Sequence, residues 1–466
     1  MKLRLFPHHT TVDRAGHLAL RGCRAADLAA QFGTPLYVYD VDTIRHQIGE
    51  YRRGLAKYPG PARLTYASKA FLCPALARLM TEEGVGLDVA SAGEVYVARQ
   101  GGAEPAHMHL HGNNKTALDL GQALQAGVGR IVVDNVDELE LLTRLAGELQ
   151  QTVKIWLRVT PDVRVETHHR YTVTGEADSK FGFPPDEAKA VAKRILLENS
   201  GLTGPLSPPN RDGTAGVGRF GQLAGNIGPV RLTGLHLHLG SYFHDATPIV
   251  LAVERLLEIA QWLRENYGWE LNELCPGGGW GVPYHHDDPP MPVEPFVSQL
   301  VEAVVRACKR RKLPLPELIL EPGRALVAPA GVALYTVGGR KAIPGVRTYV
   351  SVDGGIADNP RPALYQAKYT ALLANRAREA EVETVAVAGP FCESGDVLIE
   401  AVDLPTARPG DTLAVPVAGA YQLSMASNYN AALRPAVLFI DGHGVQLVQR
   451  RETFEDLVRR DIYAGD

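Results

Sequence analysis

Short apolar runs alternate with segments of helical periodicity over most of the chain between residues 37 and 324. Eight of these runs are short and apolar enough to be buried strands. They are Leu64–Ala67, Val85–Val89, His107–Leu110, Arg130–Val133, Lys154–Val159, Leu235–Leu239, Asn272–Cys275 and Leu318–Glu321. A segment that can form a helix follows each run, for example Pro74–Glu82 and Ile249–Asn266. Eight strand–helix units predict a (β/α)8 barrel of the TIM type.

After the eighth run the pattern changes to strand-like alternation with frequent turns, as in Arg347–Asp353 and Asp411–Val417. This texture predicts a β-rich C-terminal domain, built as a sandwich or a small barrel. Residues 200–229 break the rhythm of the barrel, because they are rich in Gly, Pro, Asn and Ser, and they predict an insertion. The predicted parts are an N-terminal segment at 1–36 that packs on the β domain, the barrel at 37–328 and the β domain at 329–466.

The composition is that of a globular protein, since 45% of the 466 residues are hydrophobic, 21% are charged and the net charge is −4. It gives no reason to expect nucleic acid or an anionic membrane as a partner. No stretch approaches the ~20 apolar residues that span a bilayer, and the N-terminus lacks the apolar core of a signal peptide. The five cysteines include no C-x-x-C pair, which argues against a disulfide framework or a zinc cluster. We therefore expect free thiols and a cytoplasmic location.

Two short segments are suited to holding a phosphate. Gly277, Gly278 and Gly279 follow the seventh predicted strand, and Glu321-Pro322-Gly323-Arg324 follows the eighth. Glycines let backbone N–H groups approach an anion, and Arg324 adds a guanidinium. A Gly-rich turn alone is weak evidence, but the ends of strands seven and eight are where such barrels commonly bind phosphate.

The other predicted strand ends are unusually polar. Lys69 follows the first strand, Asp88 lies in the second, and His238 and Ser241 follow the sixth; His111 to Lys115 and Arg158 occupy comparable positions. The carboxyl ends of the strands meet at one mouth of a barrel, so we expect Lys69 to face Glu321 and the two phosphate turns. An amine, a phosphate cradle and a carboxylate for a ring nitrogen are the parts that pyridoxal 5′-phosphate (PLP) requires.

The ordered motifs of the chain resemble those of the fold type III PLP-dependent decarboxylases. The motifs that carry the resemblance are Tyr66-Ala-Ser-Lys69-Ala, His238-Leu-Gly-Ser241, Gly277-Gly-Gly279, Glu321-Pro-Gly-Arg324, Cys392-Glu-Ser-Gly-Asp396 and Gly419-Ala-Tyr421. Three further segments narrow the resemblance to the diaminopimelate decarboxylases: Arg361-Pro-Ala-Leu-Tyr365, Ser424 to Asn430 and Arg450 to Leu457. The resemblance implies an alanine-racemase-like barrel with a β domain, and a carboxy-lyase that converts meso-2,6-diaminopimelate to L-lysine and CO₂ in lysine biosynthesis.

The resemblance also implies a role for each matched residue. Lys69 would form the Schiff base with PLP, Glu321 would pair with the pyridine nitrogen, and His238 would stack on the ring. The other residues implied to bind the cofactor are Asp88, Gly240, Ser241, Gly277, Gly278, Gly279, Gly323, Arg324 and Tyr421. Cys392 would donate the proton that replaces the carboxylate, from the partner subunit of a homodimer with shared active sites.

For the far end of the substrate, the resemblance implies a carboxylate clamp made of Arg324, Arg361, Tyr365 and Tyr421, with Glu393 as the partner of the far ammonium. A guanidinium suits a planar carboxylate through bidentate hydrogen bonds. Lysine and ornithine lack a distal carboxylate and would leave Arg361 unpaired, at a cost of roughly 1–3 kcal/mol. This argues against a polyamine-type decarboxylase.

Three alternatives stay open at the level of sequence. Tyr242 and Trp280 depart from the pattern of the family, so a same-family decarboxylase of another amino acid, such as a carboxylated polyamine or a siderophore or antibiotic precursor, is the first. A non-catalytic binding protein of the same fold is the second, although Lys69, Glu321 and Cys392 are retained. His107, His109 and His111 alternate along one run and could suggest a metal-dependent barrel hydrolase. We interpret these histidines instead as packing and surface positions, and predict no metal.

Overall fold

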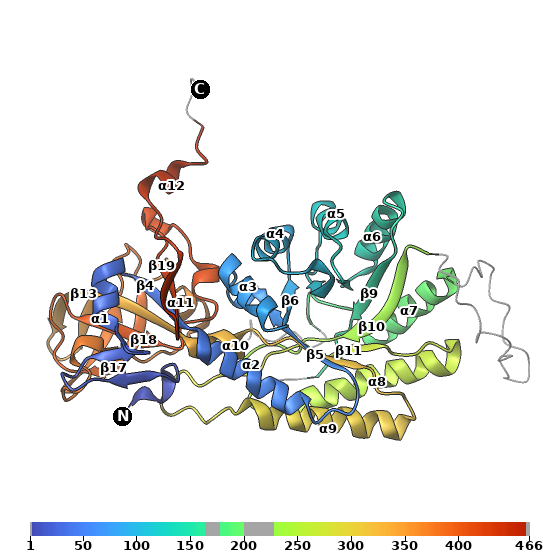
Figure 1. The fold of residues 1–466 in the computed structure, drawn as a ribbon, viewed down its shortest axis with the longest axis horizontal. Helices are drawn as coiled ribbons and strands as arrows, with labels where there is room; N and C mark the ends of the chain where they lie inside the picture. Colours follow the sequence, from blue (N-terminus) through green and yellow to red (C-terminus); the bar gives the residue numbers. More distant parts are fainter. Residues whose placement is uncertain (1, 164–177, 200–227, 463–466) are drawn as a thin grey trace, which may run out of the picture.

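The computed structural model describes residues 2–163, 178–199 and 228–462, and the eight predicted runs form a closed parallel barrel in it. Pairing of β12 with β5 closes the ring. Figure 1 shows the barrel on the right and a β-rich part on the left. The barrel strands are β5 (Ala62–Ala67), β6 (Gly86–Val89), β7 (Met108–Leu110), β8 (Arg130–Val133), β9 (Val153–Arg158), β10 (Val230–His236), β11 (Glu273–Cys275) and β12 (Glu317–Leu320). The predicted barrel is confirmed, whereas residues 200–227 of the predicted insertion lie outside the described residues.

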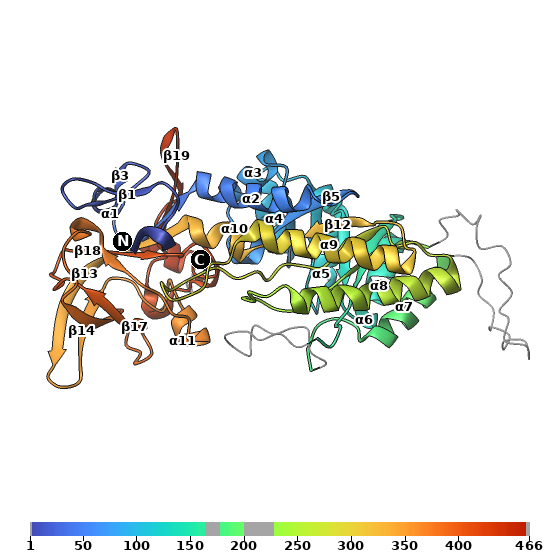
Figure 2. The same cartoon turned by 90° about the horizontal axis from the view of Figure 1, so that it is seen from below.

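A helix follows every barrel strand and covers the outside of the ring. These helices are α3 (Pro74–Glu82), α4 (Ala92–Gln100), α5 (Ala117–Ala126), α6 (Val136–Glu148), α7 (Pro185–Asn199), α8 (Thr247–Tyr267), α9 (Val293–Arg311) and α10 (Arg324–Val327). Because α10 is only about one turn long, α2 (Val41–Leu55), which precedes the barrel, packs against both α9 and α10. Figure 2 shows α8 and α9 side by side along the barrel.

Side-chain caps start several of these helices directly after a strand end. Thr116 accepts a hydrogen bond from the backbone N–H of Asp119 (3.2 Å), and the Asp119 carboxylate accepts from that of Thr116 (3.0 Å), which forms a capping box for α5. Asn135 caps α6 by accepting from the N–H of Glu138 at 2.9 Å. A cap satisfies an N–H that no helix carbonyl can reach. The residues between each strand and its cap are therefore left at the open end of the barrel.

The opposite end of the barrel is filled by a buried glutamate. Glu273 accepts hydrogen bonds from Arg130 Nε (2.9 Å), Trp156 Nε1 (2.8 Å) and Thr233 Oγ1 (2.6 Å). Burial alone would raise the pKa of the Glu273 carboxyl, but these donors lower it to about 2. The layer above it packs Val132, Trp156, Cys275 and Ile319 together inside the ring. The interior is thus a packed core rather than a pore.

The β-rich part is built on a large mixed sheet with the order β17-β16-β14-β13-β4-β19-β20, from which β13 also pairs with β18, and β18 with β15. Its strands are β4 (Leu36–Asp40), β13 (Gly331–Ile343), β14 (Arg347–Val352), β15 (Leu372–Leu373), β16 (Glu383–Ala388), β17 (Val397–Leu404), β18 (Thr412–Pro416), β19 (Ala436–Asp441) and β20 (Gly444–Gln449). The central strand β4 comes from before the barrel, so the boundary that we predicted at residue 37 runs through it.

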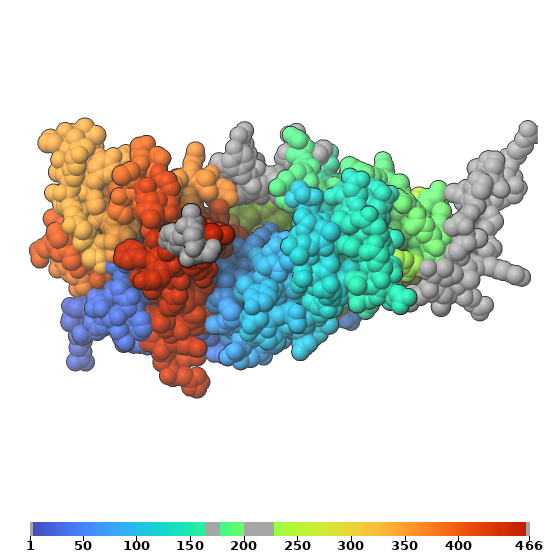
Figure 3. Space-filling model, turned by 90° about the horizontal axis from the view of Figure 1, so that it is seen from above, coloured from blue at the N-terminus to red at the C-terminus, as the bar shows by residue number. Residues whose placement is uncertain are grey.

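The N-terminal segment covers one face of this sheet. It consists of β1 (Thr10–Val12), β2 (Leu18–Leu20), β3 (Cys23–Arg24) and α1 (Ala25–Phe32). Leu18, Leu20 and Leu28 share a buried cluster with Val38 of β4 and Leu334 of β13. Two short helices, α11 (Arg361–Tyr365) and α12 (Phe454–Val458), also belong to the C-terminal half. Figure 3 shows the red C-terminal residues between the orange β-rich part and the blue barrel helices.

Candidate active site

A cavity of about 480 Å³ opens at the carboxyl ends of the barrel strands. Residues that follow β5, β6, β7, β9, β10, β11 and β12 line it, together with Arg361, Tyr365, Tyr421 and Met425 from the C-terminal half. Its size is that of a site for a small-molecule ligand or cofactor. The site therefore lies where the barrel meets the β-rich part, and both contribute side chains.

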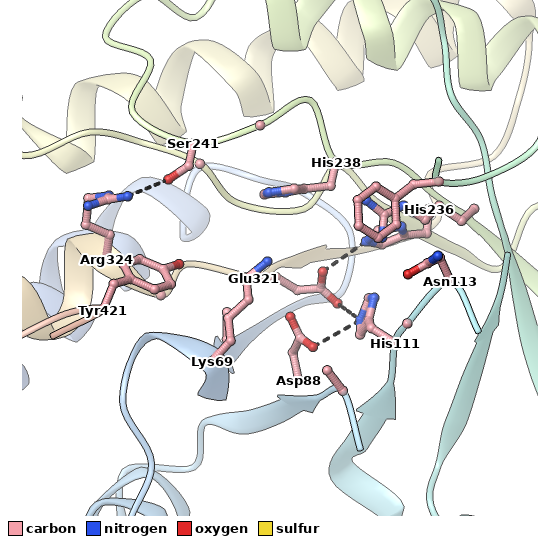
Figure 4. Close-up of a pocket in the computed structure, with 18 of the residues that line it drawn as sticks. Lys69, Asp88, His111, Asn113, His236, His238, Ser241, Glu321, Arg324 and Tyr421 are labelled. Carbon is pink, nitrogen blue, oxygen red and sulfur yellow. Dashed lines mark hydrogen bonds and ion pairs between the residues drawn. The ribbon is translucent and has the colours of Figure 1, made fainter. Parts of the chain in front are cut away.

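Lys69 projects into this cavity from the turn η2 (Ser68–Ala70), which follows β5. Its neighbours Ser68 and Ala70 are buried, whereas Lys69 itself is exposed. Figure 4 shows its amine between Glu321 on one side and Tyr421 on the other. Within the described part of the chain, Lys69 has no hydrogen-bonding or ion-pair partner of its own. The amine is thus open to a ligand.

Glu321, at the end of β12, accepts hydrogen bonds from three imidazoles. His109 Nδ1 and His111 Nε2 donate to its Oε1 at 3.2 and 3.1 Å, and His236 Nε2 donates to its Oε2 at 3.0 Å. Figure 4 shows two of these bonds and the contact between His111 and Asp88, whose atoms lie 3.5 Å apart. The side chains come from β7, the turn after it, and β10, so closure of the barrel assembles the cluster.

The charge of this cluster resides on the carboxylate. Burial by itself would raise the pKa of Glu321, but His111, His236 and His109 outweigh burial and hold the pKa well below its usual range. Burial lowers the pKa of His109 to about 4 and that of His236 to about 3, in spite of the nearby carboxylate. These two histidines are therefore neutral N–H donors at pH 7, and Glu321 is a fixed anion.

This arrangement corrects our interpretation of the three alternating histidines. His107 is exposed, as a surface position should be, but His109 and His111 are buried side chains of the site. The ligand atoms of His109, His111 and Glu321 lie within 4.8 Å of one another, a spacing that an ion could use. Hydrogen bonds from imidazole N–H groups to the carboxylate account for the same contacts.

His238 and Asp88 complete this end of the cavity. Burial lowers the pKa of His238 well below its usual value, and the neighbouring Lys69 lowers it further, so the ring is uncharged at pH 7. Figure 4 shows this ring on the opposite wall from Lys69. Burial also raises the pKa of Asp88, although His111 opposes the shift. The flat imidazole leaves room for a planar ligand between itself and the lysine.

The predicted phosphate residues divide into two groups. Gly240, Ser241, Gly279, Gly323, Arg324 and Tyr421 line the cavity. Gly277 and Gly278 do not line it but lie behind the wall, where a Cβ on Gly278 would come within 2.1 Å of the Glu321 carbonyl oxygen. Gly278 is required by the close approach of the backbone after β11 to the backbone after β12, whereas Gly277 has a φ of +74° and lies against the Leu237 carbonyl oxygen after β10.

The far end of the cavity holds two buried cations. Arg324 and Arg361 are 6% and 2% exposed, and within the described ranges neither lies within ion-pair distance of a carboxylate. Arg324 donates to Ser241 Oγ (3.0 Å) and Tyr284 Oη (2.7 Å), while Arg361 donates to the hydroxyl of Tyr369. The Nε of Arg324 is buried without a partner in the described structure. Buried cations without counter-ions predict anionic groups on the ligand.

The predicted substrate residues are only partly brought together. Tyr365 lines the cavity next to Arg361 and Tyr421. Cys392 and Glu393 do not line it: both are exposed in the loop between β16 and β17. Asp396 anchors that loop by accepting from the N–H groups of Phe391 (2.9 Å) and Ile356 (2.6 Å).

Several residues of the site were not assigned from sequence. His236 lies two positions before His238 within the predicted run Leu235–Leu239, and that alternation could have placed it on the same face. Asn113 and Arg158 belong to polar strand ends that we noted but gave no role. Phe181, whose ring lies 4.3 Å below the Arg158 guanidinium, and Met425 carry no sequence signal for this position. Trp280 stacks on Phe296 (ring centroids 3.9 Å apart) and is not among the lining residues.

Comparison with known proteins identifies the kind of site. Residues 41–204 and 222–328 match the family model of the pyridoxal-dependent decarboxylase, pyridoxal binding domain. Diaminopimelate decarboxylases of Halalkalibacterium halodurans and Bacillus subtilis are 42% and 41% identical to the chain, over 98% of both lengths. Among solved structures, the diaminopimelate decarboxylase of M. jannaschii in complex with L-lysine has a TM-score of 0.84 at 31% identity, covering 98% of each chain. A lysine/ornithine decarboxylase of Vibrio vulnificus with cadaverine has a TM-score of 0.69 at 25% identity, covering 89% and 97%.

Proposed function

Because the chain belongs to the diaminopimelate decarboxylases, a family of pyridoxal-dependent decarboxylases, we propose that it converts meso-2,6-diaminopimelate to L-lysine and CO₂. The reaction is the last step of lysine synthesis through diaminopimelate. The observation that carries the proposal is the charge pattern of the cavity, which has a fixed anion at one end and, at the other, two buried cations that have no carboxylate partner among the described residues. A cofactor with a ring nitrogen and a phosphate fits this pattern, and so does a substrate with a distal carboxylate.

The residues present fit pyridoxal 5′-phosphate. When bound, the cofactor accepts the electron pair that departing CO₂ leaves behind. Lys69 would supply the amine that holds its aldehyde, and the Glu321 carboxylate would keep a proton at the pyridine nitrogen. Gly240, Ser241, Gly279, Gly323, Arg324 and Tyr421, which line the cavity, would hold the phosphate, and His238 and Asp88 would contact the ring. The three imidazoles keep Glu321 ionised and fixed in direction, so that it favours the protonated ring nitrogen.

Arg361, Tyr365, Arg324 and Tyr421 receive the distal carboxylate of the substrate. Arg361 is almost fully buried and its charge has no carboxylate partner in the described structure, so a ligand carboxylate can repay the cost of its burial. A ligand without that group would leave the cation desolvated and unpaired. This arrangement favours diaminopimelate over lysine or ornithine as the substrate.

We further propose that the enzyme is a homodimer with shared active sites. Cys392 and Glu393 are exposed and do not line the cavity of their own subunit, so in a dimer their loop reaches the cavity of the neighbour. There Cys392 supplies the proton that replaces the carboxylate, and Glu393 pairs with the far ammonium. Mixing Lys69→Ala with Cys392→Ala tests this arrangement, because a mixed dimer regains one complete site. Recovery of about a quarter of the wild-type activity is expected for random pairing, and no recovery would contradict shared sites.

The substrate itself is tested by CO₂ release from purified protein. We expect release from meso-diaminopimelate, and little from lysine, ornithine or arginine. Preference for lysine would contradict the role of Arg361, and preference for another carboxylated amine would favour the same-family alternative. Protein that does not bind PLP would instead indicate the non-catalytic alternative.

None of the described helices is long and apolar enough to cross a membrane. All five cysteines are free thiols. Together with the biosynthetic role, free thiols support a cytoplasmic location, where they stay reduced.

A further inference from the structure

Tyr284 lies between the two arginines and has no role in the function proposed so far. It is 6% exposed and belongs to the segment between β11 and α9. Arg324 Nη1 donates to its hydroxyl at 2.7 Å, and the Arg361 guanidinium carbon lies 4.8 Å from the centre of its ring. Tyr284 therefore contacts both cations at once: its oxygen accepts from Arg324, and its ring face lies nearer to Arg361 (4.8 Å) than to Arg324 (5.8 Å).

The loop around Tyr284 holds it in place. Asp288 Oδ2 accepts hydrogen bonds from the backbone N–H groups of Tyr284 (2.7 Å) and His285 (2.9 Å). Arg4, from the N-terminal segment, donates to the carbonyl oxygens of His286 (3.1 Å) and Asp288 (2.7 Å). Tyr369 packs edge-on against the Tyr284 ring, with centroids 5.4 Å apart. Both ends of the side chain are thus fixed.

The chemistry of the contacts suits a spacer between like charges. Two guanidinium groups near one ligand repel each other, and among the described residues no carboxylate separates them. A phenol oxygen accepts from one guanidinium, and the negative face of the ring attracts the other. Burial would raise the pKa of the Tyr284 phenol, but Arg324 and Arg361 lower it below the usual value, which agrees with this placement.

We propose that Tyr284 is a positioning residue that sets the spacing and direction of Arg324 and Arg361, and thereby selects ligands that carry a distal carboxylate. The proposal rests on the proposed function, because the distal carboxylate is that of diaminopimelate and of its product L-lysine. Tyr284 is not among the residues that line the cavity, so it acts through the two arginines rather than by touching the ligand.

L-lysine and cadaverine test the proposal, since they differ only in that carboxylate. Inhibition of CO₂ release from diaminopimelate is measured for both amines with the holoenzyme. Tyr284→Phe keeps the ring but removes the hydroxyl that receives Arg324. It should raise the inhibition constant of L-lysine about tenfold, and that of cadaverine less than twofold. Tyr284→Leu removes the ring as well and should enlarge the effect on L-lysine.

A matched control is Tyr58→Phe, which removes another buried hydroxyl. Tyr58 donates to the Pro316 carbonyl at 2.7 Å, at the amino ends of β5 and β12 and away from the cavity. This variant should leave the ratio of the two inhibition constants unchanged. If Tyr284 had a purely structural role, Tyr284→Phe would raise the inhibition constants of both amines by the same factor and lower the thermal midpoint. That outcome would overturn the proposal, and so would unchanged inhibition constants.

Two further results distinguish failure of the proposed function from failure of the proposal for Tyr284. If the wild-type enzyme binds L-lysine and cadaverine equally, the carboxylate clamp itself is wrong and the proposed function fails with it. If Tyr284→Phe does not fold, a crystal structure of the wild-type enzyme with L-lysine decides the matter. Both arginines should then contact the lysine carboxylate while Tyr284 stays on Arg324, and a Tyr284 turned away from Arg324 would contradict the proposal.

Discussion

The two ends of the cavity handle buried charge in opposite ways. At one end the Glu321 carboxylate receives hydrogen bonds from His109, His111 and His236. At the other end Arg324 and Arg361 have only hydroxyl and aromatic partners in the described structure. The protein itself supplies hydrogen-bond donors to the carboxylate, whereas an anionic partner for the two cations has to come from the ligand.

The difference shows which charged groups the protein itself stabilises and which need a bound ligand as their partner. A buried charge without compensation is costly, so each end must be stabilised either by the fold or by what binds. The three imidazoles hold the pKa of Glu321 well below its usual range, so the fold itself keeps the carboxylate charged. In the proposed function the arginines become fully paired only when phosphate and carboxylate bind, which would concentrate ligand discrimination at their end.

The largest effect is expected from Lys69→Ala, because Lys69 lies between the two ends and is proposed to hold the cofactor. The variant should lose measurable turnover and the visible absorbance of bound PLP, while both charged ends stay in place. Absorbance spectra, CO₂ release and thermal unfolding check this expectation. Retained colour or activity would show that the amine is not the anchor.

Glu321→Gln removes the anion but keeps a side chain of the same shape. We expect kcat to fall roughly 10²- to 10³-fold, because the ring nitrogen loses its charged partner, together with a change in the PLP spectrum. Glu273→Gln is the matched control, since Glu273 is a buried glutamate at the closed end of the barrel. Glu273→Gln should lower the thermal midpoint without changing the PLP spectrum. Equal effects of the two variants on kcat would contradict a direct role of Glu321 at the cofactor.

Arg361→Ala removes one of the two buried cations that have no carboxylate partner among the described residues. The KM for diaminopimelate should rise about 10- to 100-fold, which corresponds to the roughly 1.5–3 kcal/mol of a hydrogen bond to a charged group. The PLP spectrum should not change. Arg361→Lys keeps the charge but not the bidentate geometry, so its KM for diaminopimelate should lie between those of the wild type and Arg361→Ala. A variant with an unchanged KM would show that the carboxylate binds elsewhere.

The smallest effect is the pH dependence of the free energy of unfolding that arises at the Glu321 end of the cavity. The pKa of His109 (about 4) lies below the unfolded value of about 6.5, so the unfolded chain binds the proton first as the pH falls. Stability is therefore complete above pH 6.5 and is lost progressively toward pH 4, by roughly 1–3 kcal/mol. The Glu321 pKa is also lowered, so its contribution is lost at still lower pH, in the same direction.

Denaturant unfolding of the wild type and of His109→Asn at pH 7, 5.5 and 4.5 measures this dependence. The asparagine does not titrate, so the variant should be less stable at pH 7 but lose less stability on acidification. Identical pH profiles would show that folding does not lower the pKa of His109.

Much of the fold could be predicted from the sequence. The alternation of apolar runs with helical segments gave the eight strands in their order, and Pro74–Glu82 was placed as a helix with the bounds that α3 has. The domain boundary was harder to place, because β4 pairs with β13 and β19, strands that are hundreds of residues later in the chain. Local periodicity carries no information on such a pairing.

For the site, the sequence by itself determined the residue types that chemistry requires at the strand ends, namely Lys69, Glu321, Ser241 and Arg324, and the resemblance added Arg361. Only the tertiary structure decided which side chains surround them. The convergence of His109, His111 and His236 on Glu321 depends on the register of β7, β10 and β12 in the closed ring, and the wedge of Tyr284 between two arginines depends on a loop held by Asp288. The physical reason is that spacing along a strand fixes the face on which a side chain lies, but barrel closure and packing fix what it meets there.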